Sequence, residues 1–391
     1  MKEFKQCIKC VMDTSDPAIS FNEFGVCSHC LNYEQSYKRM NLDNQEYVHQ
    51  KFNYLISEIK NSNKGNNKFD CVLGISGGVD SSYLAYLCNK YELSPLLVHF
   101  DNGWNTEQSV SNIEKIVKKY NFELVTYVMD WEAFRDIQRA YFKASVIDIE
   151  VPTDQFIFAS LNKIAAKYNI KYILSGYNFS SEGIMPHTWM YPYKFDLVNL
   201  KNIHRKFGNL KKLERLPKFG LYQQHYYYNF KGISTVKLLN YVDYNKMEAK
   251  KLLQEELEWK DYGEKHYESL FTRFYQGFIL PVKFGIDKRK AHLSTLINSN
   301  QLSKLQAIEI LKQPPYDSKL QEEDKIYVSK KLGFNETEFD EILKLPVIPH
   351  AFYGSEMIGW NRFLFNCYRF SVYPLVKILR LLKILKTPIS S

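Results

Sequence analysis

The sequence predicts an α/β protein built on a doubly wound parallel sheet, with an N-terminal cysteine-rich ribbon and a mainly helical C-terminal region. Three observations support this fold class. Short apolar segments alternate with helical ones between residues 71 and 175, a Gly-rich turn joins the first such pair, and two C-x-x-C pairs lie within the first thirty residues.

The two cysteine pairs are Cys7-Ile-Lys-Cys10 and Cys27-Ser-His-Cys30. Each pair can present two thiolates from a tight turn, and two pairs complete a tetrahedron. Because four thiolates leave no open position for water, this spacing predicts a structural Zn²⁺ ion bound by Cys7, Cys10, Cys27 and Cys30. A redox or Fe–S centre is the alternative. His29 is expected to be exposed or hydrogen-bonded rather than a ligand.

The Gly-rich turn follows an apolar strand, Cys71 to Ile75, and opens a helical segment, Ser81 to Tyr91. A strand–turn–helix junction points unpaired N–H groups at one place, which suits pyrophosphate. An acid among phosphate-binding groups is expected to hold Mg²⁺. The turn is not a P-loop, since the lysine of G-x-x-x-x-G-K-S/T is absent. The candidate nucleotide ligands are Ser76, Gly77, Gly78, Asp80, Ser81 and Ser82.

Further elements follow in alternation. We expect strands over Leu96 to Phe100, Glu123 to Val128 and Lys171 to Ser175, and helices over 45–60, Thr106 to Tyr120 and Asp154 to Tyr168. Ligands of such sheets bind beyond the carboxyl ends of the strands. The strand ends to inspect are therefore Ser76–Gly78, Phe100–Gly103, Val151–Asp154 and Ser175–Asn178.

The C-terminal half is predicted to be helical, and it carries several basic groups. Lys288, Arg289 and Lys290 are consecutive, so on a helix they cannot all face one ligand. One or two of them could neutralise charge on a leaving pyrophosphate. The basic residues within 199–218 are expected to form a solvent-exposed face. The more specific alternative is a binding site for an anionic substrate or an acidic partner. Arg362 to Lys386 reads as a basic amphipathic helix that either covers the core or lies on a membrane or partner.

Composition excludes some classes of protein. With 391 residues and 45% apolar content, the chain can fold into two domains or one large one, and its net charge of +9 favours anionic partners. The start, Met-Lys-Glu-Phe-Lys, carries no apolar secretory segment, and no run of 18 apolar residues occurs. We therefore expect a cytoplasmic protein, with peripheral membrane contact through the basic C-terminal helix as the alternative.

Ser76-Gly-Gly-Val-Asp-Ser81 resembles the pyrophosphate loop of the N-type ATP pyrophosphatases, the PP-loop superfamily with its adenine nucleotide alpha hydrolase-like fold. The whole chain resembles the N-acetyl sugar amidotransferases of bacterial lipopolysaccharide and pseudaminic acid pathways. The further motifs that carry this resemblance are the two cysteine pairs, His99-Phe-Asp-Asn-Gly-Trp104, Lys265-His-Tyr-Glu-Ser-Leu-Phe-Thr-Arg-Phe-Tyr-Gln276 and Phe284-Gly-Ile-Asp-Lys-Arg-Lys290.

The resemblance implies a reaction. ATP would adenylate the N-acetyl oxygen of a UDP- or CMP-linked sugar, and ammonia would displace AMP to leave an acetamidino group. A catalytic Cys after Met1 and a Gly-x-Cys-x-Gly turn are both absent, so ammonia is expected from solution or from a partner. The family resemblance implies that this partner is a separate glutaminase with a cyclase-like companion. Expected site residues beyond the loop are Phe100, Asp101 and Gly176 for the nucleotide, Lys288 and Arg289 for phosphate, and Asp154 and Glu182 for metal or ammonia.

The expected domains are a zinc ribbon over 1–45, a PP-loop ATP-binding domain over 46–240 and a helical substrate or partner region over 241–391. The first rival function is a tRNA thiolase or lysidine-type enzyme, whereas the main interpretation expects no nucleic acid. Thiolation needs accessible cysteines near ATP, and Cys71 and Cys88 are predicted to be core residues. The second rival is a scaffold that binds ATP for assembly alone.

Overall fold

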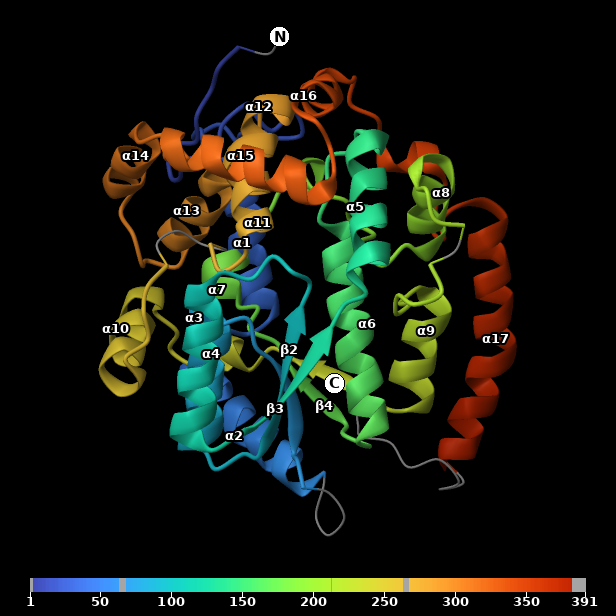
Figure 1. Ribbon diagram of the computed structural model, residues 1–391. Helices are drawn as coiled ribbons and strands as arrows, with labels where there is room; N and C mark the ends of the chain where they lie inside the picture. The colour runs from blue at the N-terminus through green and yellow to red at the C-terminus, as the bar shows by residue number, and fades with distance from the viewer. Residues whose placement is uncertain (1–2, 63–67, 212, 263–266, 382–391) are drawn as a thin grey trace.

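The computed structural model describes residues 3–62, 68–211, 213–262 and 267–381 (Figure 1). Its centre is a five-stranded, wholly parallel sheet in the order β3-β2-β1-β4-β5. The strands are β1 (Cys71–Gly74), β2 (Pro95–Asp101), β3 (Glu123–Val128), β4 (Tyr172–Leu174) and β5 (Ser234–Val236).

Helices cover both faces of this sheet, because successive side chains of a strand point to opposite faces. Cys71 and Leu73 pack with one set of helices, α2 (Gln45–Asn61), α3 (Val79–Lys90), α4 (Glu107–Tyr120) and α10 (Lys246–Leu257). Val72, between them in β1, packs with the other face, where Leu161 and Ile164 of α6 (Val151–Lys167) lie.

The remaining helices gather mostly beyond the carboxyl ends of the strands, at the top of Figure 1. Most of them share a large apolar core that includes the N-terminal cysteines and the aromatic residues Trp104, Phe271 and Phe274. The helices not yet named are α1 (Ser28–Arg39), α5 (Trp131–Ala144), α7 (Phe179–Glu182), α8 (Leu197–Phe207), α9 (Leu221–His225), α11 (Leu270–Phe274), α12 (Leu280–Phe284), α13 (Arg289–Asn298), α14 (Lys304–Lys312), α15 (Ser318–Leu332), α16 (Glu336–Lys344) and α17 (Gly359–Leu381).

Short irregular helices complete the described chain. They are the 3-10 turns η1 (His187–Trp189), η3 (Leu238–Tyr241) and η5 (His350–Tyr353), and the π-type turns η2 (Tyr226–Phe230) and η4 (Tyr275–Ile279). The π turns each interrupt a helical stretch, between α9 and Lys231 and between α11 and α12.

The predicted parallel α/β fold is confirmed, including the strands over β1 to β4 and the helix capped by Thr106. One predicted strand end is wrong, because Val151–Asp154 does not follow a strand but forms the first turn of α6. This helix starts three residues before Asp154, with Pro152 in its first turn. Proline suits that position because its missing N–H has no partner there in any case. Helix α5 and the three-residue strand β5 were not predicted.

Two surface expectations can also be checked. The expectation of a solvent-exposed face is confirmed for most of the basic run, whose exposed members are Lys201, Arg205, Lys206, Lys211, Arg215 and Lys218. Lys212 lies outside the described residues. His204 is the exception, because its buried ring bonds the Asp136 carboxylate at 2.8 Å. Within the described ranges, no helix is both long and apolar enough to cross a bilayer.

Candidate active site

The Gly-rich turn lies where the sheet changes direction. Strand β1 has β2 on one side and β4 on the other, so the chain leaves it toward one edge and later returns on its opposite side. Such a switch point opens a crevice at the carboxyl ends of the two strands. Ser76 to Gly78 follow β1 there, and Gly176 follows β4.

Gly77 is required at its position by two constraints. Its φ of +78° is in the left-handed region, and a Cβ would come within 2.3 Å of the Ser109 carbonyl oxygen. Its own carbonyl accepts hydrogen bonds from Asn112 Nδ2 (3.3 Å) and from Trp259 Nε1 (3.0 Å). Helix α4 and the segment after α10 therefore hold the turn in a shape that other residues could adopt only with strain.

The hydroxyl groups of the turn lie together. Ser76 Oγ is 3.3 Å from Ser81 Oγ and accepts a hydrogen bond from the Gly78 amide at 3.2 Å. Ser81 Oγ donates to the Gly78 carbonyl at 3.1 Å. Ser82 is fully buried in the first turn of α3. Hydroxyls and the N-terminus of α3 thus converge on one position, as a phosphate site requires.

Asp80 is held from two directions. Its Oδ1 accepts a hydrogen bond from Asn178 Nδ2 at 3.1 Å and another from the Tyr244 hydroxyl. Burial, and then the neighbouring Asp80 carboxylate, raise the pKa of Tyr244 well above its usual value, so Tyr244 stays a donor. Gly176 lies against the same residue, since a Cβ on it would be 3.4 Å from Asp80 Cβ. The Asp80 carboxylate, the Gly-rich turn and the end of β4 therefore lie together, as expected for the ends of neighbouring parallel strands.

The sequence alone did not predict that Tyr262 lies against the Gly-rich turn. The Val79 amide, first in α3, donates to the Tyr262 hydroxyl at 3.0 Å. Burial, with the nearby Glu268 carboxylate second, raises the pKa of Tyr262 above its usual value. The Tyr262 oxygen thus occupies one of the donors that a phosphate oxygen would use. The neighbouring positions Lys265 and His266 lie outside the described residues.

Phe100 and Asp101 end β2, one strand away from the turn. The Phe100 ring stacks on Tyr127 with centroids 6.1 Å apart. Asp101 Oδ1 accepts a hydrogen bond from the Gly103 amide at 2.9 Å, which closes the turn that follows β2. Both lie at the carboxyl edge of the sheet, and their contact with a nucleotide stays a prediction.

A pocket of about 100 Å³ lies close in sequence to the residues that bond Asp80. Two of its lining residues, Ser181 and Lys246, are three and two residues from Asn178 and Tyr244, the residues that bond Asp80. Ser181 Oγ is buried and has no hydrogen-bond partner in the described part of the chain. The lining consists of Ser181, Lys246, Tyr267, Gln276, Gly277, Lys288, Arg289, His292, Leu293, Leu296, Ile310 and Pro315.

The three consecutive cations diverge, as the helical spacing predicts. Lys288, at the start of α13, lines the pocket. Arg289 binds Asp287 (Nη2 to Oδ2, 2.7 Å) and donates to the Gln313 carbonyl (2.9 Å). Lys290 Nζ turns to Asp13 Oδ2 at 2.6 Å. Lys288 is therefore the member best placed to meet a ligand, whereas the predicted phosphate role of Arg289 competes with its bonds to Asp287 and Gln313.

A buried charged cluster lies behind Lys288. Lys194 Nζ is 2.5 Å from Asp154 Oδ2 and 3.4 Å from Asp148 Oδ2. Burial, and then Lys194, lower the pKa of Lys288, while Glu150, Asp148 and Asp154 oppose that shift. Asp154 is thus an ion-pair partner rather than a helix cap or an exposed acid.

Glu150 connects this cluster to the pocket. Its carboxylate accepts hydrogen bonds from Thr272 Oγ1 (2.5 Å) and from Gln276 Nε2 (3.5 Å), and Gln276 lines the pocket. Burial is the largest cause of a raised pKa at Glu150. Neither Glu150 nor Lys194 was a predicted site residue, because only the fold brings them to Lys288. Glu182 closes the short helix α7, and its role stays a prediction.

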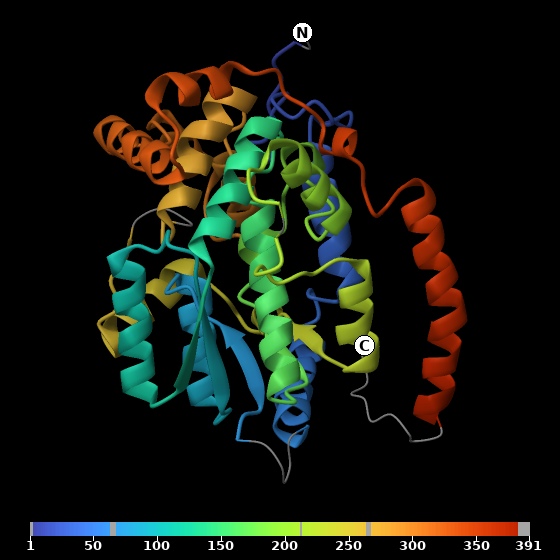
Figure 2. The ribbon, with the colours of Figure 1, turned by 45° about the vertical axis from the view of Figure 1, so that its right-hand side comes forward.

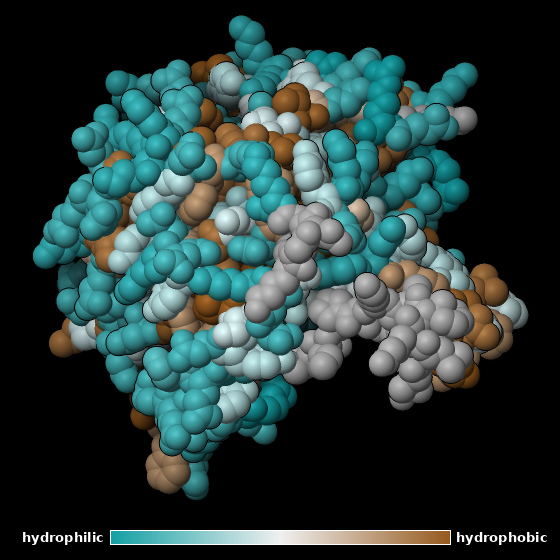
Figure 3. All heavy atoms as spheres, turned by 90° about the horizontal axis from the view of Figure 1, so that it is seen from below, coloured by the Kyte–Doolittle hydropathy of each residue, from teal (hydrophilic) through white to brown (hydrophobic). Residues whose placement is uncertain are grey.

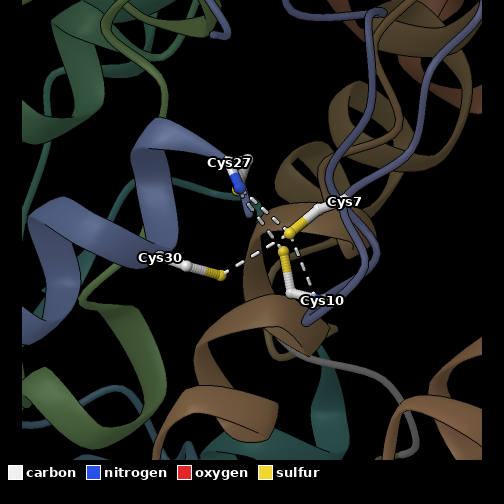
Figure 4. Close-up of side chains that lie close together, drawn as sticks. All are labelled: Cys7, Cys10, Cys27 and Cys30. Atoms are coloured by element: carbon white, nitrogen blue, oxygen red, sulfur yellow. Dashed lines mark hydrogen bonds between the residues drawn. The ribbon is translucent and has the colours of Figure 1, made fainter. Parts of the chain in front are cut away.

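The four N-terminal cysteines converge on one centre (Figure 4). Cys10 and Cys27 sulfurs are 3.7 Å apart, Cys7 and Cys30 sulfurs 4.0 Å, and all four lie within 4.8 Å of one another. A tetrahedral ion with Zn–S bonds of about 2.3 Å places its sulfurs roughly 3.8 Å apart. The donor set and its size therefore fit one tetrahedral metal ion. His29 is hydrogen-bonded to Asp16 at 2.6 Å, as expected.

Hydrogen bonds support the sulfurs and join the cluster to α13. The Cys27 amide donates to Cys7 Sγ at 3.2 Å, and Asn298 Nδ2 of α13 donates to Cys30 Sγ at 3.2 Å. The Val11 amide also donates to Ser294 Oγ of the same helix at 3.2 Å. Such bonds orient metal ligands. The cysteine ribbon is thus a support for the helix that carries Lys288.

With this geometry in place, comparison with known proteins identifies the class. Residues 48–145, which contain the Gly-rich turn, match the NAD synthase family. Together with the parallel sheet and the turn at its switch point, this match supports a PP-loop ATPase-like fold for this part of the chain.

The second match narrows the class. Residues 268–365 match the family described as LPS biosynthesis protein WbpG-like, C-terminal domain. A chain with both regions fits the N-acetyl sugar amidotransferases of the PP-loop superfamily, which confirms the resemblance found from the sequence motifs. An uncharacterized protein of Methanocaldococcus jannaschii is 25% identical over 231 residues, covering 54% of this chain and 73% of that protein.

Solved structures give more distant matches. NMN synthetase from Francisella tularensis is 16% identical, covers 78% of this chain and 98% of its own, and has a TM-score of 0.36. NH3-dependent NAD synthetase from Campylobacter jejuni is 17% identical, with coverages of 42% and 76% and a TM-score of 0.28. U34-tRNA thiolase NcsA from Methanococcus maripaludis, with a [4Fe-4S] cluster, is 14% identical, with coverages of 79% and 88% and a TM-score of 0.32.

Proposed function

We propose that this protein is an ATP-dependent amidotransferase that converts the N-acetyl group of a nucleotide-activated sugar into an acetamidino group, for lipopolysaccharide O-antigen or nonulosonic acid synthesis. The observation that carries the proposal is the junction of the two matched regions. The turn with Asp80 lies in the NAD synthase-like region, and most of the pocket, including Gln276, Lys288 and His292, comes from the WbpG-like region. The two regions meet at the turn, since a Cβ on Gly78 would be 3.1 Å from Glu268 Oε1.

The turn would bind the β and γ phosphates of ATP through Ser76, Ser81 and the amides at the start of α3. The Asp80 carboxylate is suited to hold Mg²⁺, which would neutralise charge on the phosphates. For the phosphates to reach the Val79 amide, the Tyr262 hydroxyl would have to give up its 3.0 Å hydrogen bond. We infer that Tyr262 exchanges this amide for a phosphate oxygen.

The chemistry follows from the need for a leaving group. The N-acetyl oxygen attacks the α phosphorus of ATP, the bond to pyrophosphate breaks, and an adenylated imidate forms. Ammonia then adds to the imidate carbon, AMP departs with the former acetyl oxygen, and loss of a proton leaves the amidine. Water at this step would regenerate the amide, so the pocket has to exclude it. Lys288 is placed to meet anionic groups of the sugar or the phosphates.

We further propose that the cysteine site holds Zn²⁺ in a structural role, since four thiolates would complete its coordination. The ammonia would come from a separate glutaminase with a cyclase-like companion subunit. The site is expected to act on nucleotide sugars and not on nucleic acid.

The test is a reaction with ATP, Mg²⁺, an ammonium salt and a panel of UDP- and CMP-linked N-acetyl sugars. We expect sugar-dependent pyrophosphate release, with mass spectrometry showing exchange of O for NH. Pyrophosphate release that requires bulk tRNA instead of a sugar would favour the RNA-modifying alternative. Cys71 and Cys88 are fully buried, which counts against a thiolation role for those two thiols.

A further inference from the structure

The last described helix, α17, is attached to the molecule along one side. Phe365 and Tyr368 pack against Tyr222 of α9, with ring centroids 5.5 and 5.1 Å away, and Tyr368 also meets His225. In Figures 1 and 2 the helix stands at the edge of the fold, with its long axis beside the body rather than inside it. Much of its surface is therefore open.

An apolar stripe runs along that open surface, interrupted by Ser371 and by Pro374 inside the helix. At 100° per residue its members fall within an arc of about 140°, which is one face of a helix. Figure 3 shows apolar side chains gathered where this part of the molecule projects at the right. The members and their exposed fractions are Trp360 (77%), Phe363 (54%), Leu364 (54%), Phe370 (76%), Leu375 (61%) and Ile378 (53%).

The charge around the stripe has one sign. Arg362 and Arg369, seven residues apart, share the side of the helix between the packed residues and the stripe. The chain carries no Asp or Glu after Glu356. The basic residues of this terminal stretch are Arg362, Arg369, Lys377, Arg380, Lys383 and Lys386. Large exposed aromatic side chains beside basic groups are typical of helices that lie in a membrane interface.

The apolar stripe and the basic residues beside it restrict what kind of partner can cover the stripe. A second copy placed symmetrically on α17 would bring two acid-free basic segments together, which electrostatic repulsion disfavours. A spanning role does not fit either, because no helix in the described residues is apolar and long enough. An anionic bilayer supplies both an apolar layer for the stripe and negative headgroups for the arginines.

We propose that α17 is an interfacial helix that inserts its apolar stripe into the headgroup region of an anionic membrane and so holds the protein at that surface. This proposal does not depend on the reaction proposed above.

The experiment is co-sedimentation of the full chain with sucrose-loaded vesicles. One set contains phosphatidylglycerol and phosphatidylethanolamine, and the other contains phosphatidylcholine alone. We expect binding to the first set that is at least tenfold stronger than to the second and that weakens at 0.5 M salt. The fluorescence of Trp360, obtained by subtracting the spectrum of Trp360→Phe, should shift to the blue on binding.

A matched pair of variants tests the stripe itself. Phe363→Glu with Phe370→Glu should lower vesicle binding at least tenfold. The control, Val128→Glu with Leu305→Glu, adds the same charge at apolar side chains that are 69% and 77% exposed elsewhere. Circular dichroism and thermal unfolding check that both variants fold.

Two results would overturn the proposal. One is equal vesicle binding by the stripe variant and its control, or no binding to anionic vesicles by the unaltered chain. The other is a dimer in light scattering that the stripe variant converts to monomers, because a second copy would then be the occupant.

Discussion

The turn that holds Asp80 and the pocket that holds Lys288 are built differently. The turn is one contiguous stretch, Ser76 to Ser82, shaped by a strand before it and a helix after it. The pocket and the charged cluster behind it are assembled from segments far apart in the chain, with Lys194 and Glu150 beside Lys288. The ligand groups of the turn come from one local stretch, whereas those of the pocket come from several segments and depend on how α13 is supported.

This contrast suggests that the pocket is sensitive to changes outside the site. Helix α13 is held by the cysteine ribbon through Asn298, Ser294 and Lys290. A metal ion there would stabilise Lys288 in its place without touching a substrate. The turn is also held by distant residues, Asn112, Trp259 and Tyr262, but its contacts in the described part of the chain do not include the cysteine ribbon.

The largest effect should come from breaking the remote support. Cys10→Ser removes one of four thiolates, so we expect loss of the bound metal and destabilisation by more than about 4 kcal/mol. Metal content by plasma mass spectrometry and thermal unfolding measure both. The control is Cys367→Ser, which changes an exposed thiol outside the cluster. If Cys10→Ser keeps one metal ion per chain and the melting temperature of the control, the ribbon is not a metal support.

The next test addresses the turn alone. Asp80→Asn keeps the shape of the side chain but removes the charge expected to hold Mg²⁺, so ATP-dependent pyrophosphate release should fall about 100- to 1000-fold. Stability should change little, and Asp43→Asn, an exposed acid elsewhere, should retain full activity. Activity of Asp80→Asn within threefold of the unaltered protein would remove Asp80 from the catalytic set.

Stability should depend on pH through His350, which bonds the backbone of the cluster residue Asp148. His350 is buried and accepts the Asp148 amide on Nε2 at 3.2 Å, so it is neutral, and burial lowers its pKa from 6.5 to about 4. Its stabilisation is complete above pH 6.5 and is lost as the pH falls toward 4, which amounts to about 3 kcal/mol. Denaturant unfolding between pH 7 and 4 measures it. His350→Gln should reduce this slope, and an unchanged slope would contradict the assignment.

Lys288 tests the pocket directly. Lys288→Met keeps the length of the side chain but removes its charge, and we expect sugar-dependent turnover to fall about 30- to 100-fold with little change in the KM for ATP. Lys288→Arg should recover part of the loss. A change confined to the KM for ATP would instead place Lys288 with the phosphates of the nucleotide.

Of these substitutions, Arg289→Met should have the smallest effect, which would separate the role of Arg289 from that of Lys288. Because Arg289 is engaged by Asp287 and the Gln313 carbonyl, we expect a loss of about 1 kcal/mol of stability and turnover within threefold of the unaltered protein. Steady-state kinetics of Arg289→Met, measured in parallel with those of Lys288→Met, test this expectation. A loss of turnover equal to that of Lys288→Met would restore the phosphate role predicted for Arg289.

The sequence alone determined the features that local chemistry specifies. A strand followed by Ser76-Gly-Gly-Val-Asp-Ser81 and a helix predicts a phosphate turn, and two C-x-x-C pairs predict four converging thiolates, because each motif needs few neighbours to take its shape. Strand–helix alternation likewise predicted the parallel sheet. The expected domain boundaries and the glutaminase partner stay predictions.

Only the tertiary structure decided how the rest of the site is assembled. It engaged Arg289 with the Gln313 carbonyl, paired Asp154 with Lys194, placed Tyr262 over the turn and tied the cysteine ribbon to α13. The physical reason is that side-chain partners more than a few turns apart are chosen by packing of whole helices, and the chemical type of a residue does not encode which distant residue it will meet.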